Sequence, residues 1–145
     1  MIFKSKKSWL FSLITFGTTS LLFATIGIRI YQNQFVKEDL VGVFISILVI
    51  PLLFSIYFNT YYTLSKGTLK YKCGPIKGDV LIKDISRIDL NKKLWSGIKP
   101  ATSMDGMIIY YGKYDEIFIS PDNKELFVKK LLELNDRIEV ISNKN

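Results

Sequence analysis

The chain contains no histidine and only one cysteine among its 145 residues. Without histidine it lacks the side chain that most often acts as a general base and as a metal ligand. Its single thiol, Cys73, cannot form an internal disulfide and is not a metal site by itself. The two absences argue against histidine-dependent catalysis and against a disulfide-stabilised domain.

Patterns for other reactions are missing as well. A Ser–Lys pair is the remaining route to a nucleophile, but neither Ser65-Lys66 nor Ser86 stands in a recognisable motif. No loop has EF-hand spacing, and "GPIKG" has too few glycines to bind phosphate. Carboxylates occur near turns or a helix start, where capping explains them: Asp105, Asp115, Glu116 and Asp122. We therefore expect no catalytic residue, no cofactor and no metal.

Charge is scarce in the first part of the chain. Residues 9–58 hold only four charged side chains, and most of the others lie in residues 61–145. The net charge of +7 is a mild basic excess. It suits an anionic membrane leaflet, where each basic group contributes about 1 kcal/mol. No arginine-rich helix, RNP-like strand or zinc-finger spacing supports nucleic acid as a partner.

Two long apolar runs, residues 9–28 and 40–58, predict transmembrane helices. Twenty helical residues span about 30 Å, which is the thickness of a bilayer core. We assign residues 1–60 to a two-span hairpin, in which Pro51 should kink the second helix. The alternative is a cleaved signal peptide, because Lys4–Lys7 resembles its basic start. The first run is too long for that and no clear cleavage site follows.

Small residues suggest how the helices meet. Their spacing places one set on one face of the first helix, and a second pair shares a face of the second helix: Gly17, Ser20, Ala24 and Gly27; Gly42 and Ser46. Close packing at such positions joins transmembrane helices, within one chain or between copies in a homo-oligomer. The alternative is that transmembrane helices are simply rich in glycine and serine.

Lysine placement predicts the orientation. Lysines precede the first run and follow the second, whereas the loop between the runs holds only Arg29 and Lys37. The positive-inside rule then places both termini in the cytoplasm and predicts a multi-pass protein of the inner cell membrane. Aromatic residues flank the runs where interfacial side chains are expected: Trp9, Tyr31, Tyr57 and Tyr61.

Residues 61–145 read as a separate α+β domain. Ser65-Lys66-Gly67 predicts a hairpin, Gly74-Pro75 and Gly78-Asp79 predict a second turn, and "KDISRIDL" predicts a helical turn leading into a strand. A second hairpin is expected around residues 113–115. A helix should follow, with Ser120 as N-cap and Pro121 first. Its core-facing residues are spaced by four, three and four: Phe127, Leu131, Leu134 and Ile138.

These segments resemble a known family. "FNTYYTLSKGTLKYKCGPIKGDVLIKDISRI" and "MIIYYGKYDEIFISPDNKELFVKKLLEL" are similar to the bacterial PH-like domain of YyaB-type membrane proteins, which include the sublancin immunity protein. The resemblance implies an antiparallel sheet or roll closed by the C-terminal helix, at the cytoplasmic face of the membrane. It implies binding and no reaction. The chain departs from the family at "KKLWSGIKPATSMDG", which leaves the start of the next strand open.

The candidate contact surface is the segment 91–99, where Lys92, Lys93 and Lys99 surround Trp95. An aromatic ring with basic neighbours can insert among headgroups while the lysines meet anionic lipid. The alternative, which we favour, is that Trp95 covers the sheet edge and the lysines are solvated.

Two functions remain from the sequence. The first is a non-catalytic, membrane-anchored binding protein that confers bacteriocin immunity by shielding a toxin target. The second is a general membrane-associated scaffold that binds a protein or anionic lipid and has no connection with toxins.

Overall fold

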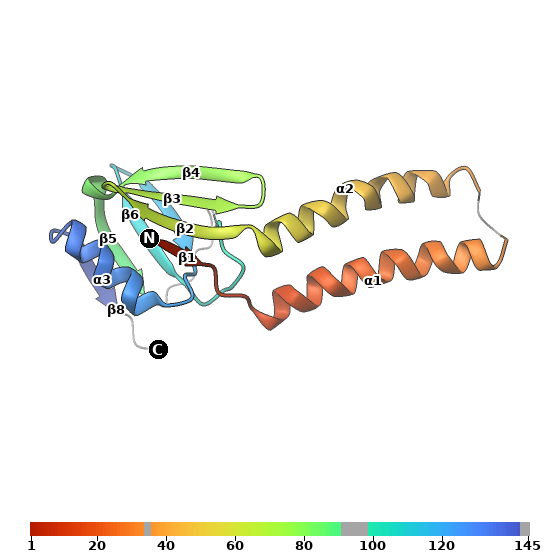
Figure 1. Cartoon of the computed structure of the whole chain (residues 1–145), viewed down its shortest axis with the longest axis horizontal. Coiled ribbons are helices and arrows are strands. Elements are labelled where there is room, and N and C mark those ends of the chain that lie inside the picture. Colours follow the sequence, from red (N-terminus) through yellow and green to blue (C-terminus); the bar gives the residue numbers. More distant parts are fainter. Residues whose placement is uncertain (34–35, 91–98, 143–145) are drawn as a thin grey trace.

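The structure has two long helices attached to one end of an α+β body (Figure 1). It is a computed structural model that describes residues 1–33, 36–90 and 99–142. The helices are α1 (Trp9–Tyr31) and α2 (Asp39–Phe58). The predicted order of two apolar helices, antiparallel sheets and a C-terminal helix is confirmed.

Both helices are long and apolar enough to cross a membrane, by length and composition. Only 6% of the apolar window of each is buried against the rest of the molecule, so neither is the core helix of a soluble fold. α1 ends at Tyr31, beyond the predicted residue 28. In this last turn, Arg29 Nε lies 3.9 Å from Asp39 Oδ1 at the start of α2.

The two helices touch through aromatic side chains near the body. The rings of Phe11 and Tyr57 stack with centroids 6.2 Å apart, and Phe16 lies edge-on to Tyr57 at 5.4 Å. The small-residue prediction fails for the glycines within one chain. A Cβ added at Gly17, Gly27 or Gly42 would meet nothing within 4 Å. Ser46 of the predicted pair is nevertheless buried, as is Thr15 of α1. A homo-oligomer through these faces stays a prediction.

The body contains two four-stranded sheets. One has the order β1-β2-β3-β4 and is antiparallel throughout, and the other has the order β7-β6-β5-β8, in which β8 runs parallel to β5. The first sheet is built from β1 (Ile2–Lys4), β2 (Thr60–Ser65), β3 (Thr68–Cys73) and β4 (Ile76–Leu81). The second is built from β5 (Ile85–Leu90), β6 (Met107–Tyr111), β7 (Asp115–Ile119) and β8 (Glu139–Ser142).

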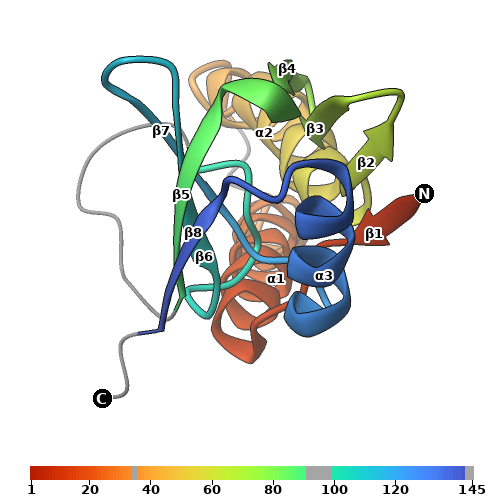
Figure 2. The same cartoon turned by 90° about the vertical axis from the view of Figure 1, so that its left-hand side faces the viewer.

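Alternating apolar residues of both sheets form one core. In β2 and β3 every second side chain is buried, which is the period of a strand with one face in the core. α3 (Lys124–Leu134) adds Phe127 and Leu131 to this core. Figure 2 shows α3 between β1 and β8, where it closes the body.

The predicted hairpin at residues 65–67 is confirmed, and its turn has the positive backbone φ angles that such a turn requires. Lys66 and Gly67 both have positive φ (46° and 76°), as a tight hairpin requires. The helical turn Ile82–Asp84 and the hairpin between β6 and β7 are also confirmed. The predicted turn at Gly78-Asp79 is wrong, because both residues lie inside β4. Gly78 is paired with Tyr71, whose hydroxyl would lie 2.3 Å from a Cβ at that position.

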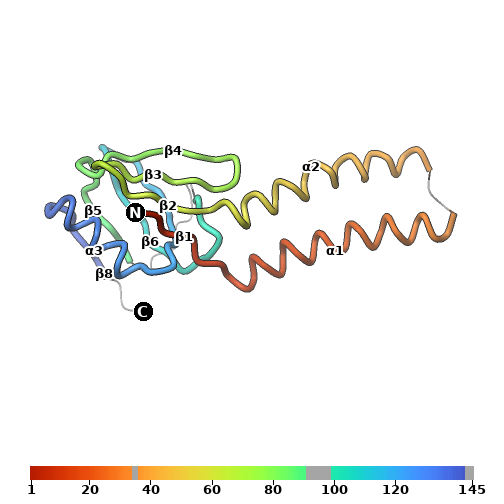
Figure 3. Tube along the Cα trace, viewed as in Figure 1, coloured from red at the N-terminus to blue at the C-terminus, as the bar shows by residue number. Residues whose placement is uncertain are grey.

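The extreme N-terminus differs from the prediction. Residues 1–60 are predicted to form the membrane hairpin, but Ile2–Lys4 form strand β1 and pair with β2. Phe3 is only 6% exposed, and its ring meets that of Phe127 edge-on at 5.0 Å. The chain therefore starts inside the body before it leaves as α1 (Figure 3).

The C-terminal helix starts later than predicted. Asn123 is the N-cap, and its Oδ1 accepts a hydrogen bond from Leu126 N at 2.9 Å. Ser120 is instead a buried residue at the end of β7, so the predicted cap is wrong. The helix stops at Leu134, which is exposed, and Ile138 lies in the link to β8. Phe127, Leu131 and Ile138 are buried in the core as predicted, although Ile138 lies outside the helix, and the prediction is wrong for Leu134.

Candidate membrane-proximal site

The end of the body that carries both helices contains a buried polar network. It consists of four hydroxyl side chains from separate parts of the chain, which we call the hydroxyl network: Ser5, Tyr62, Thr102 and Ser120. Ser5 Oγ lies 3.0 Å from both Ser120 Oγ and Thr102 Oγ1. Because buried polar groups are costly unless bonded, the network fixes how these segments meet.

Tyr62 is the largest member of the network. Its hydroxyl donates to the carbonyl of Pro100 at 2.6 Å and accepts from the backbone N–H of Ser120 at 3.1 Å. Burial raises the pKa of the Tyr62 hydroxyl, against the effect of its hydrogen bonds with Ser120 and Ser5. Tyr62 thus holds the segment after residue 98 against the first sheet.

Thr102 connects the same segment to the start of α1. Its Oγ1 lies 2.9 Å from the carbonyl oxygen of Lys6, to which it can donate. Its own carbonyl accepts from Ser8 N, the residue before α1, at 3.1 Å. α1 is therefore attached to the body through residues 5–8 and 100–102.

Asp105 lies between two lysines on the surface beside this junction. Lys6 Nζ is 2.8 Å from Asp105 Oδ2, and Lys124 pairs with Oδ1. The hydrogen bonds from Lys124 and Lys6 lower the pKa of the Asp105 carboxyl. In turn, the hydrogen bond to Asp105 raises the pKa of Lys6. The triad ties the N-terminal segment to the start of α3.

The lowered pKa of the Asp105 carboxyl predicts that its ion pairs stabilise the fold at neutral pH but not in acid. Because the folded-state pKa lies below the unfolded value of about 3.9, the contribution is present above that pH and is lost as the pH falls through the folded pKa. Asp105→Asn should lower the unfolding midpoint at neutral pH, and the two proteins should converge in acid. Chemical unfolding over a pH series measures this. Asp136→Asn is the control, since Asp136 is exposed and forms no ion pair with a described residue. An Asp105→Asn deficit that persists in acid would contradict the assignment.

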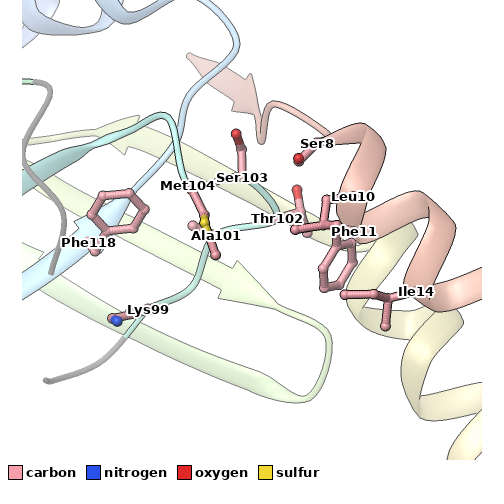
Figure 4. A pocket seen from close by; sticks show the side chains of 10 residues that line it. All are labelled: Ser8, Leu10, Phe11, Ile14, Lys99, Ala101, Thr102, Ser103, Met104 and Phe118. Carbon is pink, nitrogen blue, oxygen red and sulfur yellow. The ribbon is translucent and has the colours of Figure 1, made fainter. Parts of the chain in front are cut away.

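An apolar pocket of about 400 Å³ lies between the first turns of α1 and residues 99–104 (Figure 4). Phe118 of β7 forms one of its walls. Phe118 belongs to a small second core cluster with Ile108, packed by Ala101 and Tyr110 and separate from the main core. The complete described lining is Ser8, Leu10, Phe11, Ile14, Lys99, Ala101, Thr102, Ser103, Met104 and Phe118.

Of the four predicted contact residues, the structure describes one. Lys99 is exposed and lines the pocket. Lys92, Lys93 and Trp95 lie outside the described residues. The structure therefore places Lys99 in one pocket with apolar residues of α1, although at the opposite end from them.

A second group of lysines lies over aromatic rings near the bases of the helices. Lys7 Nζ is 4.2 Å from the ring centroid of Tyr57 and 4.8 Å from that of Phe58. Lys72 Nζ is 5.8 Å from the ring of Tyr61. Aromatic rings paired with cations are typical of the headgroup region of a membrane.

Sequence reasoning missed the hydroxyl network, Gly106 and the pocket. The network joins residues up to 115 positions apart, so no local pattern indicates it. The only indication of a special role for Gly106 in the sequence was the Asp105-Gly106 pair. A Cβ at this position would lie 2.3 Å from the carbonyl oxygen of Ile119 and 2.6 Å from the Phe118 ring. Glycine is therefore required where the chain passes this close to the end of β7.

Comparisons with known proteins agree with the fold. A family described as bacterial PH domain matches residues 60–135, which is about half of the chain. The Bacillus subtilis (strain 168) "Uncharacterized protein YyaB" is 33% identical over 87 residues, covering 59% of this chain and 60% of that protein. The match thus spans about 60% of the length of this curated relative. No solved structure matches the chain significantly.

Proposed function

Because the chain belongs to the bacterial PH domain family, we propose that it is a non-catalytic binding protein anchored in the cell membrane by α1 and α2. Its body is held at the cytoplasmic face and binds a protein or anionic lipid there. Family membership and the two apolar helices support this role. It explains why a small binding domain carries two apolar helices of which only 6% of the apolar window is buried.

The observation that carries the proposal is the pairing of β1 with β2. Lys4 lies opposite Tyr61 in this pair, so the chain enters α1 and leaves α2 at neighbouring points of one sheet. If both helices cross the bilayer, the N-terminal strand and the body must share one side of it. Together with the lysines at that end, the pairing supports a cytoplasmic body and an external loop.

Cysteine labelling tests this orientation. Native Cys73 is buried and would be a poor reporter, so it is replaced by alanine in all variants. Tyr31→Cys, at 90% exposure, reports on the loop between the helices, and Tyr114→Cys, at 86% exposure, reports on the body. We expect an impermeant maleimide to label position 31 in intact cells and position 114 only after permeabilisation. The reverse pattern would invert the topology, and labelling of both positions in intact cells would contradict a two-span anchor.

Bacteriocin immunity, which the resemblance suggested, stays a prediction. The family description and the relative's name identify no toxin. Survival of a bacteriocin-sensitive strain that expresses the full chain tests this role. A general scaffold is the alternative, and it requires the same anchor and the same body.

A further inference from the structure

The pocket between α1 and residues 99–104 is continuous with the membrane-facing surface of α1. Leu10 and Ile14 line the pocket and are also exposed on the helix. They lie in the first two turns, directly after the exposed Trp9. If α1 enters the bilayer at Trp9, the pocket opens where headgroups meet acyl chains.

The one charged group of the described lining lies at the end away from α1. Figure 4 shows Ile14 and Phe11 at the α1 end of the pocket, Lys99 and Phe118 at the far end, and Met104 and Ala101 between them. Lys99 is the one charged residue in the described lining. A mainly apolar occupant with an anionic group near Lys99 would therefore match this lining.

The volume and chemistry suit part of an amphiphile. Sites for small ligands measure about 300–1,000 Å³ and combine a mainly apolar wall with a few polar groups. This pocket, at about 400 Å³, falls in that range and adds hydroxyls of Ser8 and Ser103 to Lys99. Because the pocket is open to the surface of α1, a lipid of the surrounding leaflet can enter it without leaving the membrane.

We propose that this pocket binds one anionic phospholipid of the cytoplasmic leaflet. Lys99 faces its phosphate, and Leu10 and Met104 contact the upper part of an acyl chain. The site rests on the proposed membrane anchor. Since Thr102 and Ser8 connect the pocket wall to the start of α1, an occupied pocket also holds the body in a defined position on the bilayer.

Photocrosslinking in the full chain tests the occupant. A benzoylphenylalanine replaces Met104, which is exposed and lines the pocket, or Tyr114, which is also exposed but lies in the β6–β7 turn. The protein is reconstituted in phosphatidylcholine vesicles with or without phosphatidylglycerol. We expect a crosslink to phosphatidylglycerol from position 104 and none from position 114.

Matched substitutions test the two ends of the pocket. Lys99→Gln should lower the yield of phosphatidylglycerol crosslink about fivefold, the effect of one basic group near an anionic surface, whereas Lys113→Gln should not change it. Ile14→Trp should fill the apolar end and lower the yield, while Leu13→Trp, on the same exposed helix but outside the lining, should leave it unchanged. All four positions are exposed, so the variants should fold.

The outcomes separate this inference from the anchor. Vesicle flotation of the wild type without a lipid crosslink at position 104 overturns the pocket and leaves the anchor intact. Equal yields at positions 104 and 114, or no change in either Lys99→Gln or Ile14→Trp, also overturn the pocket. A crosslink from position 104 to another protein chain assigns the pocket to a protein partner and refutes the lipid. Failure to float overturns both proposals.

Discussion

Replacing Phe3 by alanine should lower the free energy of unfolding by about 3–5 kcal/mol, the usual cost of removing a buried phenylalanine. Phe3 is 6% exposed, and its ring packs edge-on against Phe127 of α3. The loss would be a large part of the stability of a small domain. Urea unfolding in detergent micelles, followed by near-UV circular dichroism, measures it.

The neighbouring residue provides a matched control. Ile2 belongs to the same short strand but is 68% exposed, so Ile2→Ala should change stability little. Equal small losses for Ile2→Ala and Phe3→Ala would show that β1 does not contribute to the core. The same reasoning predicts that the fragment 61–145, which lacks β1, loses Phe3 from its core and leaves the edge of β2 unpaired. Binding studies therefore need the full chain.

Tyr62→Phe should have the second-largest effect, a loss of about 2–3 kcal/mol, because it leaves two buried backbone groups without their partner. These groups are the carbonyl of Pro100 and the N–H of Ser120, both bonded to the Tyr62 hydroxyl. The ring remains, so the loss reports on hydrogen bonds and not on a cavity. Amide hydrogen exchange should also become faster at Ala101 and Thr102.

Tyr61→Phe is the control for this change. Tyr61 is the adjacent residue of β2, is half-buried, and its hydroxyl forms no hydrogen bond with a described residue. We expect its unfolding curve to match that of the unsubstituted protein. If Tyr62→Phe kept full stability and unchanged exchange at residues 101–102, the hydroxyl network would not hold that segment in place.

Local patterns predicted the hairpin at Lys66-Gly67, the helical turn before β5 and the hairpin between β6 and β7. Each depends on residues close together in sequence. Of the described residues that line the pocket, only Lys99 was among the predicted contact residues, and its contact with a membrane or a partner stays a prediction. The other walls come from α1, from residues 101–104 and from β7. In the sequence, the α1 residues that line the pocket indicate only a membrane span, and Phe118 indicates only a strand.

The errors have a common physical origin. A glycine inside a strand and a glycine in a turn look alike in sequence, and only the pairing of Gly78 with Tyr71 of β3 distinguishes them. A three-residue strand has no periodicity to detect, and lysines beside an apolar run are typical of a membrane flank. Ser120 and Pro121 have the residue types of a helix start. In the folded chain, however, the backbone N–H of Ser120 donates a hydrogen bond to the Tyr62 hydroxyl.

Composition and periodicity by themselves determined that the chain has two apolar helices, a chain of short strands and a late amphipathic helix. These properties follow from the preference of each side chain for water or for an apolar phase. That preference can be read in each segment without knowledge of the others. Only the tertiary structure decided that the first residues complete the sheet and that α1 is attached to residues 100–102. Those outcomes depend on hydrogen bonds and ring contacts between segments far apart in sequence, whose partners become neighbours only when the chain is folded.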